Sequence, residues 1–150
     1  MAEETKEERL DRELEELLQE LRIALPGVQI LFAFLLVVPF NNRFAETDDL
    51  QRDVWFAALL LALGAVACFI TPTAYHRIRF RDYDKERLVT TATRLAVVGL
   101  VFLATALSAS AFFVTGFVFS DRAAAIVTVL AAGTIGGLWF ALPLVRKLRS

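Results

Sequence analysis

The stretch Ile70–Arg94, ITPTAYHRIRFRDYDKERLVTTATR, separates two long apolar runs of this 150-residue chain. It carries six lysine or arginine residues. Basic residues of this kind gather in the short loops that remain on the cytoplasmic side of a membrane. The stretch therefore predicts a cytoplasmic loop, and placing this loop assigns a side of the membrane to every other segment.

Hydrophobic residues make up 57% of the chain, above the roughly 45–50% that is usual for soluble domains. The excess is concentrated in four runs, at residues 23–40, 54–75, 95–119 and 123–145. Each run is long enough to cross a bilayer as a helix. The sequence therefore predicts an all-α fold, a single membrane domain that forms a four-transmembrane-helix bundle.

Residues 3–22 predict a cytoplasmic amphipathic helix ahead of the first span. Four leucines recur at spacings of four, three and four between Leu10 and Leu21. Nine acids against four basic residues make the polar face acidic, whereas helices that bind lipid surfaces are normally basic. This favours packing of the leucines on protein: another copy of the helix, a partner, or the basic loop at 77–87. A solvated helix at the membrane interface is the alternative.

Prolines and capping side chains predict where the helices bend, end and begin. Pro26 and Gly27 predict a break between the acidic helix and the first span, and Pro39 predicts a kink or the end of that span. Pro72 predicts a bend at the inner end of the second span. Three later helix starts are predicted from residues suited to capping: Asp48, Asp84, and Ser120 or Asp121.

The distribution of lysine and arginine predicts the orientation. The amino-terminal segment, the second loop and the carboxy-terminal tail together hold 13 of these residues, and the other two loops hold three. We expect a multi-pass protein of the cell (inner) membrane with both termini in the cytoplasm. The basic residues of the second loop either hold anionic lipid head groups or the acidic helix, or only fix the topology. The candidates are Arg77, Arg79, Arg81, Lys85 and Arg87.

Polar side chains in or beside the spans are candidates for contact with a solute. They are Gln29, Thr71, Thr73, His76, Thr105 and Ser108. Glutamine and hydroxyl side chains also form hydrogen bonds between helices or within their own helix, so both interpretations stay open. The single histidine, His76, is either a pH sensor or proton relay, or an interfacial residue without a special role.

A GxxxG spacing in the fourth run predicts a face for close helix packing, within the subunit or between subunits. Gly133 and Gly137 form the motif, and Ala141 continues it by one turn. Small residues of the second run, among them Ala58, Ala62 and Gly64, also permit close helix contact.

The chain lacks the motifs of an active site: it has no nucleotide loop, nucleophile elbow or metal-ligand spacing. All 17 acids lie outside the four runs, whereas ion-coupled carriers usually hold an ionisable side chain at membrane depth. We therefore expect no enzymatic activity, no catalytic residue, no cofactor, no metal site and no nucleic-acid partner.

Four segments carry a resemblance: Glu20–Gln29 (ELRIALPGVQ), Val38–Phe44 (VPFNNRF), Thr71–Arg77 (TPTAYHR) and Asp84–Arg87 (DKER). The chain resembles a family of small four-span bacterial membrane proteins of unknown function, some of which are labelled sodium/proton antiporters. The resemblance covers most of the chain and is strongest from Glu13 to Arg94. It implies the four-span topology and brings no catalytic residue.

Two functions fit these patterns. The first is a self-associating interaction or structural module, a homo-oligomer in the bilayer that works through its acidic helix and basic loop. The second is an ion or small-solute channel or transporter formed by an oligomer, including the sodium/proton exchange that the family label suggests. Its path would be lined by serine, threonine and Gln29, beside helices kinked at Pro39 and Pro72.

Overall fold

The computed structural model describes residues 5–78 and 85–149, and all regular elements in these ranges are helices. The long helices are α1 (Lys6–Val37), α2 (Asp49–Ile78), α3 (Lys85–Val118) and α4 (Asp121–Gly136), and the short α5 spans Leu142–Arg149. Two 3-10 turns, Val38–Phe40 and Asn42–Glu46, connect α1 to α2, and a π turn, Gly137–Ala141, connects α4 to α5. Four helical segments are long and apolar enough to cross a membrane, which confirms the all-α, four-span prediction of a multi-pass membrane protein.

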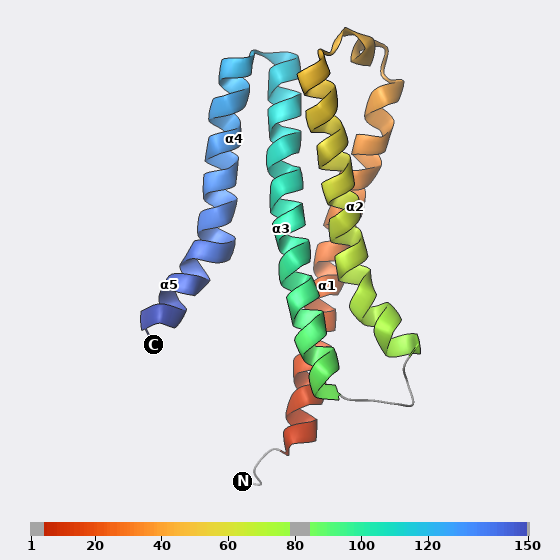
Figure 1. The fold of residues 1–150 in the computed structure, drawn as a ribbon, viewed down its shortest axis with the longest axis vertical. Coiled ribbons are helices and arrows are strands. Elements are labelled where there is room, and N and C mark those ends of the chain that lie inside the picture. The colour runs from red at the N-terminus through yellow and green to blue at the C-terminus, as the bar shows by residue number, and fades with distance from the viewer. Residues whose placement is uncertain (1–4, 79–84, 150) are drawn as a thin grey trace.

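Helices α1, α2 and α3 pack on one another, whereas α4 packs on α3 alone among the described helices (Figure 1). The chain runs up and down, so the start of α1 and the end of α5 lie toward one end of the molecule, which we call the terminal end. The 3-10 turns and the connection between α3 and α4 lie at the opposite end, the turn end. The fold is therefore a three-helix core with a fourth helix attached to one side.

The break predicted at Pro26 and Gly27 is wrong, because α1 continues through both residues. Leu21 and Val28, which lie on either side of the proline, are both buried in one cluster with Phe69 of α2. Packing on both sides of the proline holds the two halves in one helix, although Pro26 has no N–H to donate within it. The acidic segment and the first span therefore form one continuous helix.

The predicted helix starts agree with the described capping contacts. The Asp48 carboxylate accepts a hydrogen bond from the Gln51 backbone N–H at 2.7 Å, and the Ser120 hydroxyl accepts one from the Ala123 N–H at 3.3 Å. Both contacts satisfy backbone donors that a helix start leaves without an internal partner. Helix α3 begins at Lys85, and Asp84 lies outside the described residues.

The α2–α3 contact is the tightest part of the core. A Cβ atom on Gly99 of α3 would lie 2.7 Å from Cδ1 of Phe69, and a Cβ on Gly64 of α2 would lie 2.9 Å from Cδ2 of Phe102. Each helix thus supplies a glycine that admits a phenylalanine ring of the other. The small residues predicted to allow close contact of α2 agree with this, since Ala58 and other alanines of α2 are fully buried.

Candidate functional site

The leucine face of the acidic segment packs within the chain itself. Leu10, Leu14 and Leu21 are buried in the isolated chain, so its own helices cover them. Leu21 clusters with α2, and the Lys6 ammonium pairs with the Glu86 carboxylate at the start of α3 at 2.6 Å. The alternatives were another copy of the helix, a partner, or the basic loop at 77–87. Helix α1 packs on α2 and α3 of its own chain, and Glu86, the partner of Lys6, lies within residues 77–87. The leucines are therefore not free to bind a partner.

The predicted basic cluster falls largely outside the described part of the chain. Arg79 and Arg81 lie outside the described residues. The backbones of His76 and Arg77 belong to the end of α2 and that of Lys85 to the start of α3, but their side chains are also outside the description. Among the basic candidates, only Arg87 has a described side chain, and it is exposed. The role of this cluster therefore stays a prediction.

The polar candidates of the spans do not gather into one site. Gln29 is exposed on α1, and Thr71 and Thr73 are exposed on α2 near the terminal end. The Thr71 hydroxyl donates a hydrogen bond to the Ala67 carbonyl at 2.7 Å. The next carbonyl along the chain, that of Cys68, lacks its usual helical donor because Pro72 has no N–H. Hydroxyl groups in spans commonly bond in this way within their own helix.

Thr105 and Ser108 lie together in a groove between α3 and α4. Their hydroxyls donate to the carbonyls of Val101 and Ala104 at 2.8 and 2.9 Å. The groove encloses about 350 Å³. Its lining comprises Val101, Ala104, Thr105 and Ser108 of α3 with Ala132, Ile135, Gly136 and Phe140 of α4 and the π turn. Both hydroxyl-bearing side chains thus line a groove that is otherwise apolar.

A π turn interrupts the predicted glycine ladder. The Leu142 N–H donates a hydrogen bond to the Gly137 carbonyl, five residues earlier in the chain. The next residue, Pro143, has no backbone N–H. A proline at this position disfavours a regular α turn and bends the helix, and α4–α5 diverges from α3 toward the terminal end (Figure 1). Ala141 is therefore not one regular α turn beyond Gly137, although it remains exposed.

The face that holds Gly133 of α4 and Gly137 of the π turn is open in the single chain. No other part of the described chain lies within 4 Å of a Cβ built on Gly133, Gly136 or Gly137. Large apolar side chains of α4, among them Val129 and Leu130, are also exposed. The motif therefore does not hold α4 to the rest of its own subunit.

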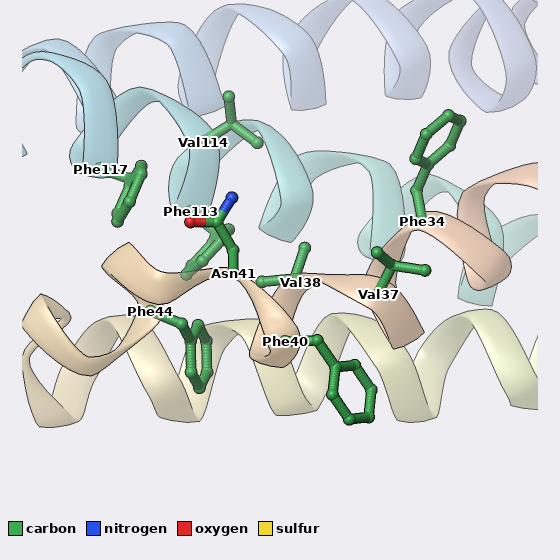
Figure 2. Close-up of a pocket in the computed structure, with 9 residues that line it drawn as sticks. All are labelled: Phe34, Val37, Val38, Phe40, Asn41, Phe44, Phe113, Val114 and Phe117. Carbon is green, nitrogen blue, oxygen red and sulfur yellow. The ribbon is translucent and has the colours of Figure 1, made fainter.

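Sequence reasoning missed an aromatic pocket at the turn end (Figure 2). Its volume is about 430 Å³. It is lined by Phe34, Val37, Val38, Phe40, Asn41, Phe44, Phe113, Val114 and Phe117. A signal was present in the chain, because two pairs of phenylalanines, at 40 and 44 and at 113 and 117, each stand four residues apart.

A proline and a tryptophan hold one wall of this aromatic pocket. Helix α1 ends at Val37, near Pro39 as predicted, and Pro39 has no N–H for the Leu35 carbonyl. The indole N–H of Trp55 on α2 donates to that carbonyl at 2.9 Å. The Trp55 ring also meets the ring of Phe44 edge to face, with centroids 5.1 Å apart. The connection between α1 and α2 is therefore anchored on α2.

Polar and charged groups lie at the edge of the aromatic pocket. The Arg43 guanidinium lies 4.7 Å from the centroid of the Phe117 ring, a cation–π contact. The Arg43 Nε is 3.7 Å from the Glu46 carboxylate, and both side chains are largely exposed. The Asn41 side-chain oxygen Oδ1 accepts a hydrogen bond from the Arg43 backbone N–H at 3.0 Å, and the Asn41 side-chain amide points toward α3 (Figure 2). The pocket thus combines an apolar lining with an amide, a cation and an anion.

Comparison with known proteins places the chain in a family without an assigned activity. A model of DUF6328, a family of unknown function, matches residues 3–143, so the chain belongs to this family. No curated protein and no solved structure matches the chain. The expectation of an uncharacterised family is confirmed, while the bacterial origin and the antiporter label stay predictions.

Proposed function

We propose that this protein is an integral protein of the cell (inner) membrane that works by self-association and has no enzymatic activity. The association surface is the face that holds Gly133 of α4 and Gly137 of the π turn. One observation carries this proposal: that face meets no other part of the described chain within 4 Å of a Cβ built on either glycine.

Helix association in lipid favours such a face. Lipid tails are as apolar as leucine, so helices gain little from hydrophobic burial and associate through close backbone approach at small residues. Helix α4 packs only on α3 among the described helices, which leaves its other side to a neighbouring subunit. Packing of two α4 helices would bury the glycines together with exposed neighbours such as Leu130.

The acidic face of α1 supplies a second contact in this proposal. The leucine face is already covered within the chain, so only the charged face remains for contacts between subunits or with partners. The excess of basic residues at the terminal end supports a cytoplasmic location for both termini. The basic residues between α2 and α3 then lie on the same side, where acidic helices or anionic lipid head groups reach them.

The test is the subunit count of the purified protein in lipid nanodiscs, measured by native mass spectrometry with crosslinking as a check. We expect dimers or larger oligomers, and we expect mainly monomers for the double variant Gly133→Ile with Gly137→Ile, because added side chains prevent close approach. Ala57→Ile, which adds a branched side chain at an exposed position of α2, is the matched control. A monomeric parent protein, or a double variant with an unchanged subunit count, would contradict the proposal.

A pathway for ions or small solutes between subunits is the second candidate function. The observation in its favour is that Thr105 and Ser108 line a groove between α3 and α4 that is otherwise apolar. Proteoliposomes that hold the oligomer should then show flux of one ion, and Thr105→Val with Ser108→Ala should abolish that flux. Absence of flux under sodium, potassium and proton gradients would remove this candidate.

A further inference from the structure

The aromatic pocket lies where the hydrocarbon core of a bilayer would meet the head groups. The first apolar run ends at Phe40, directly before two asparagines and Arg43. Trp55, which contacts Phe44, is of the residue type that gathers at membrane interfaces. A ligand in this pocket would therefore have its apolar part at acyl-chain depth and its polar part at head-group depth.

The lining and opening of this pocket suit an acyl chain. Its volume of about 430 Å³ lies within the roughly 300–1,000 Å³ of typical small-molecule sites. The lining side chains other than Asn41 are phenylalanine or valine. Phe34 is 70% exposed, Phe40 86% and Val114 56%, so this side of the pocket opens toward the surrounding lipid.

The polar edge of the pocket presents two opposite charges side by side. The Arg43 guanidinium lies over Phe117, which lines the pocket, and the Glu46 carboxylate is 3.7 Å from the Arg43 Nε. A zwitterionic phospholipid carries a phosphate and an ammonium group that complement this pair. The side-chain oxygen of Asn41 accepts a hydrogen bond from the backbone of the 3-10 turn. The side-chain N–H groups of Asn41 can donate hydrogen bonds to an ester carbonyl of a lipid.

The surrounding charge disfavours an anionic head group. Residues 41–53 hold two arginines against four acids, and Arg52 is already within 3.7 Å of Asp49. A net anionic lipid would meet this acidic surface without an ammonium group to offset it, whereas a zwitterionic lipid brings its own positive charge.

We propose that the turn end binds one zwitterionic phospholipid. One acyl chain occupies the aromatic pocket, the phosphate lies against Arg43 and the ammonium group lies against Glu46. The Asn41 amide donates to an ester carbonyl of the same lipid. This site is independent of the association face on α4, so either proposal can fail without the other.

The test is native mass spectrometry of the delipidated full-length protein, titrated with phosphatidylethanolamine or with phosphatidylglycerol of the same acyl chains. We expect one phosphatidylethanolamine per subunit to bind at least about tenfold more tightly than phosphatidylglycerol. Equal binding of the two lipids, or a series of equivalent weak binding events for both, would overturn the proposal.

Two matched pairs of variants locate the site. Val114→Phe fills the pocket and should remove the tight binding event, while Val129→Phe, the same change on an exposed position of α4, should leave it unchanged. Glu46→Gln should reduce the preference for phosphatidylethanolamine, while Glu15→Gln, which removes one exposed acid of the amino-terminal segment far from the pocket, should keep it. Equal effects within either pair would contradict the assignment. Circular dichroism of each variant confirms that it retains its helical content.

Discussion

The α2–α3 contact and the open face of α4 both present glycines, but the glycines do opposite things. Gly64 and Gly99 each admit a phenylalanine ring from the neighbouring helix, at a distance that leaves no room for a Cβ. Gly133 and Gly137 have only open space beside them in the single chain. The recognisable GxxxG motif lies on the open face, while the glycines that close the core belong to no such motif. A glycine in a span marks internal packing only when a large side chain is placed opposite to it.

The largest expected effect comes from a glycine-to-alanine change in the α2–α3 contact, compared with the same change on the open face of α4. Gly99→Ala should destabilise the protein by about 3 kcal/mol, at the upper end of the range for overpacking, because the Phe69 ring that it meets is fully buried. Gly133→Ala should instead stabilise it by up to about 1 kcal/mol, through the better helix propensity of alanine. Free energies of unfolding in mixed detergent micelles, under conditions where the protein is monomeric, measure both changes.

A second substitution tests the cause of the Gly99→Ala effect. Phe69→Leu in the Gly99→Ala background should recover part of the lost stability, because the smaller side chain gives way to the new Cβ. Similar changes in unfolding free energy for Gly99→Ala and Gly133→Ala would show that the two faces do not differ as described.

The next effect concerns two leucines on different helices, one buried and one exposed. Leu14→Ala should cost about 2 kcal/mol, at the lower end for a buried leucine, because the side chain is covered by the chain itself. Leu130→Ala should change the stability of the monomer by less than about 0.5 kcal/mol, as is usual for exposed positions. The same unfolding assay under monomeric conditions compares them, and a cost for Leu14→Ala no larger than that for Leu130→Ala would argue against internal packing of the acidic segment.

A smaller effect is expected at the turn end of the core. Trp55→Phe removes the donor to the Leu35 carbonyl and should cost about 1–1.5 kcal/mol. Adding Pro39→Ala should recover part of this loss, because alanine restores a backbone N–H for that carbonyl. Trp139→Phe, on the π turn beside α4, is the matched control. A double variant no more stable than Trp55→Phe would refute this account of the proline and the tryptophan.

The smallest effect is expected for the charged contact between α1 and α3. Lys6→Met should cost less than about 1 kcal/mol, since both side chains of the Lys6–Glu86 pair are largely exposed. The loss should shrink further at 1 M salt, where exposed charges are screened. Measurement of unfolding at low and high salt checks this, and a large loss that is insensitive to salt would indicate that the pair is buried in the bilayer-bound protein.

Several features could be read from the chain because they depend on neighbours in sequence. The four apolar runs predict four helices that cross a membrane, since an unpaired backbone is too costly in lipid. Asp48 and Ser120 predict helix starts because a capping side chain needs only the next few residues. The end of α1 follows from Pro39 for the same reason. Charge segregation likewise predicts an orientation, because the rule counts residues in loops and needs no tertiary contact.

Other features depended on contacts between residues far apart in the chain. The continuity of α1 through Pro26 follows from packing of Leu21 and Val28 on α2, and the position of Gly99 matters only because Phe69 lies opposite. The aromatic pocket joins α1, the 3-10 turns and the end of α3, so no single segment contains it. The sequence by itself determined which segments are helical and apolar, because helix formation and hydropathy are local properties. Only the tertiary structure decided which helix faces are covered and which remain open, because that depends on which side chains meet across the helices.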